Sequence, residues 1–147
     1  MKFNSISVLI PVYNEKHTIK ECVERVLNSD TCNLKLDIII SDNNSNDGTK
    51  EILETIDNEK VKCYFKDKNE GKGSNIKNAL KYAAGDLILF QDADLEYHPE
   101  NYPDLIYPFL KNEADVVYGS RLTGAKTTKI MGWSHRVGNN AFTLLAN

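Results

Sequence analysis

Three acidic side chains, Asp92, Asp94 and Glu96, follow a short apolar run at residues 87–90. Such a run, bounded by turn residues, is typical of a buried strand, so the acids would lie at its exposed tip. Carboxylate oxygens spaced this closely suit a hard cation such as Mg²⁺ or Mn²⁺, with a phosphate as a further ligand. A D-x-D triplet alone is a weak signal, because acids also solubilise ordinary turns. The rest of the chain must decide between the two interpretations.

Polar residues also follow other predicted strands. They are Glu15 after residues 6–13, Asp42 after residues 36–41, and Arg121 after residues 114–118. In a parallel sheet the carboxyl ends of the strands share one edge, and ligands usually bind there. The sequence therefore predicts that polar groups distant along the chain converge at a single edge.

The chain alternates predicted strands with predicted helices. Apolar runs of strand length lie at residues 6–13, 36–41, 61–66, 87–90 and 114–118. Apolar residues at helical spacing lie between them, at residues 19–27, 52–56, 76–83 and 102–110. The third of these helices is expected to bury Ile76, Ala79, Leu80 and Ala83. This alternation is typical of an α/β domain, a mostly parallel sheet with helices on both faces.

The composition, with 41% hydrophobic and 27% charged residues, is that of a single globular domain. No segment approaches the ~20 apolar residues of a membrane-spanning helix, so we expect a soluble, cytoplasmic protein. The three cysteines lack C-x-x-C spacing and are expected to be structural thiols.

The net charge is −3, yet the segment after residue 115 holds basic residues and no acid. That segment suits an anionic partner or is a solvated surface, and no nucleic-acid partner is expected.

Other phosphate-handling motifs fit less well. The segment Gly71-Lys72-Gly73-Ser74 is not a P-loop, because no glycine lies five residues before Gly71 and glycine follows the lysine. Its glycines either let the backbone approach a ligand or form the turn into a helix.

An aspartyl-phosphate receiver domain would also gather acids and Mg²⁺ at strand ends. Against it, no lysine follows the predicted fifth strand.

Five segments at predicted strand ends together resemble the family 2 glycosyltransferases, which have the GT-A (Rossmann-like) fold. They are residues 7–15, 42–49, 69–73, 92–94 and 119–121. The resemblance is to the dolichol-phosphate mannosyltransferase and polyprenyl-phosphate glycosyltransferase branch. It implies a nucleotide-sugar-binding core over residues 1–121 and part of an acceptor region over residues 122–147. Enzymes of this branch generally continue further, so we expect the chain to be shortened at its carboxyl end.

The resemblance also implies roles for individual residues. The nucleotide pocket would be lined by Pro11, Tyr13, Glu15, Ile40 and Asp42. Asp92 and Ala93 would lie beside the ribose and diphosphate, while Asp94 and Glu96 would hold Mg²⁺ or Mn²⁺. That cation would neutralise the leaving nucleoside diphosphate.

Two arginines would bind phosphates. Arg121 would contact a phosphate of the donor or acceptor through its planar guanidinium, and Arg136 would contact the acceptor phosphate. The predicted catalytic residues are therefore Asp92, Asp94 and Arg121.

The implied reaction is transfer of a hexose from a GDP- or UDP-linked sugar with inversion at the anomeric carbon. A polyprenyl (dolichyl) phosphate acceptor would need no base, because its oxygen is already a nucleophile, whereas a hydroxyl acceptor would need a carboxylate. The lack of acids after Asp115 favours the phosphate acceptor, met at the cytoplasmic face of a membrane.

One departure from the family pattern leaves part of this hypothesis open, and one absent motif excludes a related function. The common Asp-Asp-Gly-Ser becomes Asp42-Asn43-Asn44-Ser45, which removes the second carboxylate and leaves the base open. No Q-x-x-R-W stretch is present, so a processive polysaccharide synthase is not expected. The alternative function is a truncated nucleotide-sugar-binding domain without turnover of its own, completed by a membrane or a protein partner.

Overall fold

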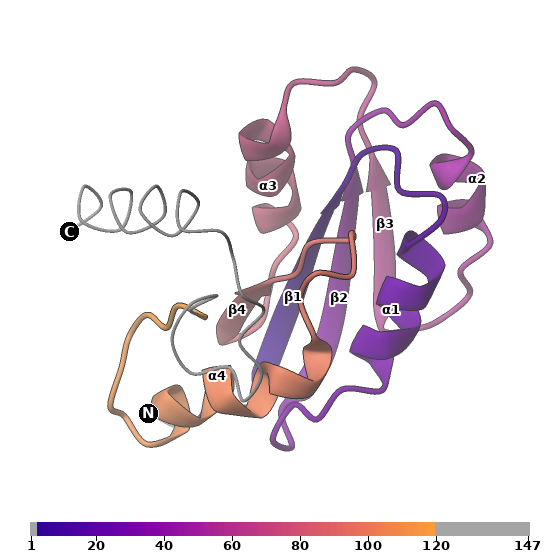
Figure 1. The fold of residues 1–147 in the computed structure, drawn as a ribbon. Helices are drawn as coiled ribbons and strands as arrows, with labels where there is room; N and C mark the ends of the chain where they lie inside the picture. The colour runs from indigo at the N-terminus through magenta and orange to yellow at the C-terminus, as the bar shows by residue number, and fades with distance from the viewer. Residues whose placement is uncertain (1–2, 120–147) are drawn as a thin grey trace, which may run out of the picture. The chain divides into compact units, whose positions relative to one another are not determined.

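The computed structural model describes residues 3–119, and the chain divides into two compact units, Met1–Asp115 and Val116–Asn147. The first unit contains a parallel sheet whose strands lie in the order β3-β2-β1-β4 (Figure 1). The strands are β1 (Ser5–Val12), β2 (Lys35–Asp42), β3 (Val61–Phe65) and β4 (Leu87–Phe90). The helices are α1 (Ile19–Leu27), α2 (Thr49–Glu54), α3 (Lys72–Leu80) and α4 (Tyr102–Leu110), with a 3₁₀ turn η1 at Pro99–Asn101. The predicted α/β fold with a parallel sheet is confirmed.

Strand β1 is the centre of this sheet and is buried on both faces. Val8, Leu9 and Ile10 have no measurable exposure, and β1 pairs with β2 on one side and β4 on the other. Burying each side chain of this size contributes about 1.5–3 kcal/mol. A continuous run of β-branched and leucine residues therefore forms a central strand rather than an edge strand.

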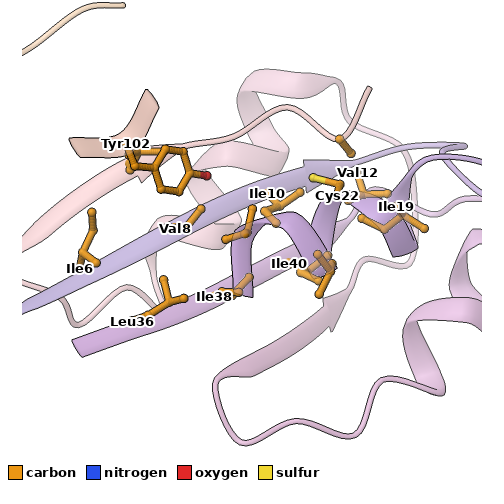
Figure 2. Close-up of a cluster of buried hydrophobic side chains, with 14 of the residues drawn as sticks. Ile6, Val8, Ile10, Val12, Ile19, Cys22, Leu36, Ile38, Ile40 and Tyr102 are labelled. Carbon is orange, nitrogen blue, oxygen red and sulfur yellow. The ribbon is translucent and has the colours of Figure 1, made fainter. Parts of the chain in front are cut away.

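Helices cover both faces of the sheet. On one face, Val8 and Ile10 of β1 and Ile38 of β2 pack against α1, α2 and α4 in the larger cluster of buried side chains. Figure 2 shows part of this cluster, with the Tyr102 ring above β1 and Ile19 of α1 near Val12 at the end of that strand. On the opposite face, α3 packs through Ala79 onto a smaller cluster, formed with Leu9 and Ile39.

The buried face of α3 differs from the predicted one. Ala79 is buried as expected, but Leu80 is 38% exposed and Asn75, a polar residue, is buried in its place. The reason is that the Asn75 side chain donates to backbone oxygens of β1 and β2, 3.2 Å from the Val12 oxygen and 2.7 Å from the Ser41 oxygen. Apolar periodicity cannot reveal a helix that packs through hydrogen bonds.

The predicted fifth strand at residues 114–118 is wrong for the part of the chain that the structure describes. Residues 114–119 form no strand, and Val116 and Tyr118 are 64% and 88% exposed. A strand exists only when its backbone pairs with a neighbour, and a short apolar run does not ensure this pairing. Within residues 3–119, β4 is therefore an edge strand of the sheet.

The order of the strands creates a switch point between β1 and β4. The chain moves outward from β1 to β2 and β3, returns through α3 on the other face, and adds β4 beside β1. In open parallel sheets, ligands bind at the carboxyl ends of the strands where the order reverses in this way. The D-x-D triplet follows β4 and is thus at the predicted position. No helix within residues 3–119 has the length and hydropathy needed to cross a bilayer.

Candidate functional site

The loops after β1 and β2 are joined by hydrogen bonds. The Asn14 backbone N–H donates to Ser45 Oγ at 2.8 Å, and the Asn46 backbone N–H donates to Asn14 Oδ1 at 2.9 Å. The Glu15 amide donates to Thr49 Oγ1 at 2.8 Å, and its Oε2 accepts from the Thr18 hydroxyl at 2.7 Å. Asn14 has φ 57°, a left-handed conformation that asparagine tolerates better than most residues. Two motifs that lie far apart in sequence thus form one rigid corner.

Asp42 is buried at the end of β2, with 1% exposure. Its Oδ2 accepts from the Ser45 amide at 3.0 Å, and its Oδ1 accepts from the Ser45 hydroxyl. The carboxylate thus accepts from the backbone three residues further on and fixes the loop that follows the strand. The predicted contact between Asp42 and a nucleotide base or ribose stays a prediction.

Asn43 links the β2 loop to the loop before α3. Its Nδ2 donates to Asn69 Oδ1 at 2.6 Å, while its Oδ1 accepts from the Glu70 amide at 3.2 Å. A carboxylate could accept but could not donate, so aspartate at this position would lose half of the link. The asparagine that replaces the family's second aspartate therefore has a structural explanation.

The D-x-D loop is held from below by Gln91, which is 1% exposed. Gln91 Nε2 donates to the backbone oxygens of Asp92 at 2.9 Å and Tyr97 at 3.3 Å, and its Oε1 accepts from the Tyr102 hydroxyl at 2.8 Å. Within the loop, Leu95 has φ 65°. A buried and fully hydrogen-bonded amide thus fixes the backbone that carries the acids.

The three acids of the loop have different environments. The Asp92 side chain is 23% exposed, and its Oδ1 lies 2.7 Å from the Lys72 ammonium. Asp94 is exposed, and its Oδ1 accepts from the Glu96 amide at 3.0 Å. Glu96 is also exposed, whereas Ala93 is buried and packs in the larger core cluster. The loop therefore presents two acids to solvent and pairs the third with a lysine.

The Cys22 thiol of α1 contacts the D-x-D loop, where it donates to the Asp92 backbone oxygen at 3.7 Å. Burial raises the pKa of this thiol to about 12, and the negative charge of Asp94 adds to the effect. Arg25 opposes the shift, while Glu15 and Asp92 raise the pKa further. Glu15, which follows β1, and the two aspartates of the D-x-D loop therefore act on the same buried thiol.

The acids at this edge fit a divalent cation whose remaining ligands come from a substrate. No cluster of three or more potential metal-binding side chains occurs among residues 3–119. Asp94 and Glu96 nevertheless offer two exposed carboxylates in one turn. Mg²⁺ and similar cations are commonly held by one or two carboxylates together with phosphate oxygens and water. The residues present are compatible with such a cation.

The structure brings most of the predicted site residues to this edge. Tyr13 is 43% exposed, and Pro11 and Glu15 are half-buried. Ile40 is completely buried in the core cluster, so its side chain does not reach the edge. Arg121 and Arg136 lie outside the described residues.

Three residues that hold the edge together were not predicted as site residues. They are Asn75, Gln91 and Lys72, and all act through contacts between segments distant in sequence. The one available signal was Asn75, four residues before Ala79 on a helix face that otherwise reads as apolar. The lysine and the glutamine give no sequence pattern that predicts their partners.

Comparison with known proteins gives consistent results. The family model "Glycosyl transferase family 2" matches residues 7–146. A dolichol-phosphate mannosyltransferase of Pyrococcus furiosus is 34% identical over 129 residues, which are 87% of this chain and 36% of the relative. An undecaprenyl-phosphate 4-deoxy-4-formamido-L-arabinose transferase of Proteus mirabilis is 34% identical over 109 residues, 71% of this chain and 33% of the relative.

A solved structure has a similar fold. The mannosyltransferase of Pyrobaculum calidifontis, in complex with GDP-Man and Mn²⁺, has a TM-score of 0.55 and 25% identity, over 63% of this chain and 28% of that one. This chain thus spans about a third of the length of the curated relatives that it matches. The predicted GT-A fold and the predicted family are both confirmed. The chain belongs to glycosyl transferase family 2.

Proposed function

We propose that this chain provides the donor-binding part of an inverting glycosyltransferase. The enzyme would transfer a hexose from a GDP- or UDP-linked sugar to a polyprenyl phosphate, with Mg²⁺ or Mn²⁺. The observation that carries the proposal is the joining of four strand-end segments into one edge, with the D-x-D loop at the switch point between β1 and β4. The names of the curated relatives and the Mn²⁺ in the solved relative support it.

The residues of the edge have distinct tasks in this proposal. Asp94 and Glu96 would hold the cation, which stabilises negative charge on the departing nucleoside diphosphate. Tyr13 and Glu15 would position the nucleotide, and the Glu15 backbone N–H is held by Thr49 at the start of α2. A phosphate oxygen of the acceptor is already anionic at neutral pH and attacks without a general base. The reaction then depends on binding and orientation more than on proton transfer.

The acceptor would be met at the cytoplasmic face of a membrane. The segment that follows residue 115 holds Arg121, Lys126, Lys129 and Arg136 and no acidic residue. Basic side chains of this kind favour an anionic partner, here the polyprenyl phosphate, and the two arginines are the proposed phosphate contacts.

A second candidate function is donor binding without turnover. The chain spans about a third of its curated relatives' length, so donor binding and transfer are separate proposals for these residues. A protein or membrane partner would then supply the remaining contacts. Both candidates share the same donor site and differ only in product formation.

The test combines donor binding with transfer. Calorimetry would measure binding of GDP-, UDP- and dTDP-linked sugars with Mn²⁺, and a radiolabelled donor would report transfer to a polyprenyl phosphate. Asp94→Ala should weaken Mn²⁺-dependent donor binding about 10- to 100-fold, the effect of losing a charge-assisted ligand worth roughly 1.5–3 kcal/mol. Asp57→Ala, an exposed aspartate before β3 at the opposite edge of the sheet, is the matched control.

The outcomes separate the hypotheses. Donor binding with transfer supports the enzyme, and donor binding without transfer supports the second candidate. Unchanged donor affinity in Asp94→Ala would refute the site, provided that the variant keeps the wild-type circular dichroism spectrum.

A further inference from the structure

Lys72 connects the loop before α3 to the D-x-D loop. It is the first residue of α3, and its Nζ lies 2.7 Å from Asp92 Oδ1. The lysine side chain is 64% exposed, whereas the aspartate side chain is only 23% exposed. The aspartate side chain is thus mostly covered by protein, and the lysine reaches it on an exposed stem of the flexible kind that lysine has.

The backbone of Lys72 is fixed to the sheet edge from two sides. The preceding Gly71 has φ 84°, and its amide donates to Asn69 Oδ1 at 2.9 Å. One turn later, the Asn75 backbone N–H donates to the Gly71 oxygen, and the Asn75 side chain donates to the Ser41 backbone oxygen. The glycine thus forms the turn into the helix, and this turn aims the lysine at the D-x-D loop.

The charges around Lys72 explain why an ammonium belongs there. Asp92, Asp94 and Glu96 lie within five residues of one another, so the edge is strongly acidic before any cation binds. One lysine partly offsets that charge. Once a divalent cation neutralises the acids, the same ammonium has a weaker hold on Asp92 and can pair with another anion.

A diphosphate bound at the D-x-D loop would be such an anion. Lysine binds phosphate as a compact point charge on a flexible stem, so it can exchange a carboxylate for a phosphate without movement of the backbone. The exchange needs only a rotation of the exposed side chain. It would place a positive charge beside the group that leaves with the nucleotide.

We infer that Lys72 is a donor-binding residue that pairs with Asp92 in the free chain and with the diphosphate of the sugar nucleotide in the loaded site. This inference rests on the proposed function. It assigns to Lys72 the class of ligand that it binds, a nucleoside diphosphate. It also predicts effects of opposite sign on the binding of the cation and of the donor.

The experiment measures both kinds of binding in Lys72→Met. Electron paramagnetic resonance would measure Mn²⁺ alone, and calorimetry would measure the GDP- or UDP-linked sugar with Mn²⁺. Mn²⁺ alone should bind about threefold more tightly, because a partly exposed competing cation has been removed. The sugar nucleotide should bind about tenfold more weakly, because a charge-assisted phosphate contact has been lost.

Two further variants control the comparison. Lys72→Arg keeps the charge and should retain donor affinity within about threefold of the wild type. Lys77→Met removes an exposed lysine from the last turn of the same helix and should change neither affinity. Circular dichroism and a thermal melt would confirm that each variant is folded.

The possible results are distinct. If the wild-type chain binds no sugar nucleotide, the proposed function fails and the inference fails with it. If the wild type binds the donor and Lys72→Met binds it equally well, the inference alone is overturned. If Lys72→Met weakens Mn²⁺ and donor binding together, the lysine only maintains the loop, and the inference is again overturned.

Discussion

The substitution Asn75→Ala tests whether buried hydrogen bonds, rather than apolar packing, hold α3 on the sheet edge. Asn75 is 2% exposed and lies where Ala79 also faces the sheet. Its Nδ2 donates to the oxygens of Val12 at 3.2 Å and Ser41 at 2.7 Å, and its Oδ1 accepts from Ser41 Oγ at 2.6 Å. Alanine keeps the helix and removes all three contacts.

The expected cost follows from what each partner loses. The Val12 backbone oxygen still accepts from the Asn43 backbone N–H, and Ser41 Oγ still accepts from Asn78 Nδ2. The three lost hydrogen bonds contribute roughly 1 kcal/mol each, so we expect the free energy of unfolding to fall by about 3 kcal/mol. The melting temperature should fall by roughly 10 °C or more.

Urea denaturation followed by circular dichroism would measure this change. Asn58→Ala is the matched control, because Asn58 is exposed and its side chain accepts one hydrogen bond, from the Lys60 backbone N–H. It should cost less than about 1 kcal/mol. Asn75→Asp should cost at least as much as Asn75→Ala, because a carboxylate cannot donate to two carbonyl oxygens. If Asn75→Ala and Asn58→Ala lose equal stability, the reasoning is refuted.

Two further predictions concern the packing beneath the site. A Cβ on Gly85 would lie 2.4 Å from the Ser7 backbone nitrogen, so Gly85→Ala should separate β4 from β1 and cost about 1–3 kcal/mol in urea denaturation. Wild-type stability in this variant would show that the strands adjust freely. The raised pKa of Cys22, about 12 against an ordinary 9.0, means that the folded chain keeps a proton that the unfolded chain loses. Stability should therefore fall as pH rises from about 9 to 12, by up to about 1.4 kcal/mol per pH unit. A Cys22→Ala variant with an equally steep fall would contradict this.

Much of the fold follows from local sequence patterns. The strands β1 and β2 each contain a continuous apolar stretch, residues 8–12 and 38–40, which is what burial on both faces of a parallel sheet requires. The face of α1 is equally clear, because Ile19, Cys22 and Val26 recur at helical spacing and are all buried. The edge that gathers the polar residues follows from parallel pairing alone. These features depend on periodicity, which a single sequence displays.

The remaining features depend on partners that the sequence does not indicate. The run at residues 114–118 has the composition of a strand, but it has no paired neighbour within residues 3–119. Asn75 faces the sheet because its side chain donates to two backbone oxygens at the strand ends, a contact that no apolar pattern predicts. The pairing of Lys72 with Asp92 joins the first residue of α3 to the loop that follows β4. Tertiary contacts decide each of these cases.

Asn43 shows how such contacts change the interpretation of a motif. From sequence, asparagine in place of the family's second aspartate is a lost carboxylate that leaves the catalytic base open. In the structure, the Asn43 side chain donates to Asn69 Oδ1 and accepts from the Glu70 backbone N–H. It therefore joins the β2 loop to the turn that carries Lys72. An aspartate there would accept but not donate, and the turn would be held less firmly. The residue thus contributes to loop geometry, and its identity does not depend on a need for a base. A phosphate acceptor, which requires none, is consistent with this arrangement.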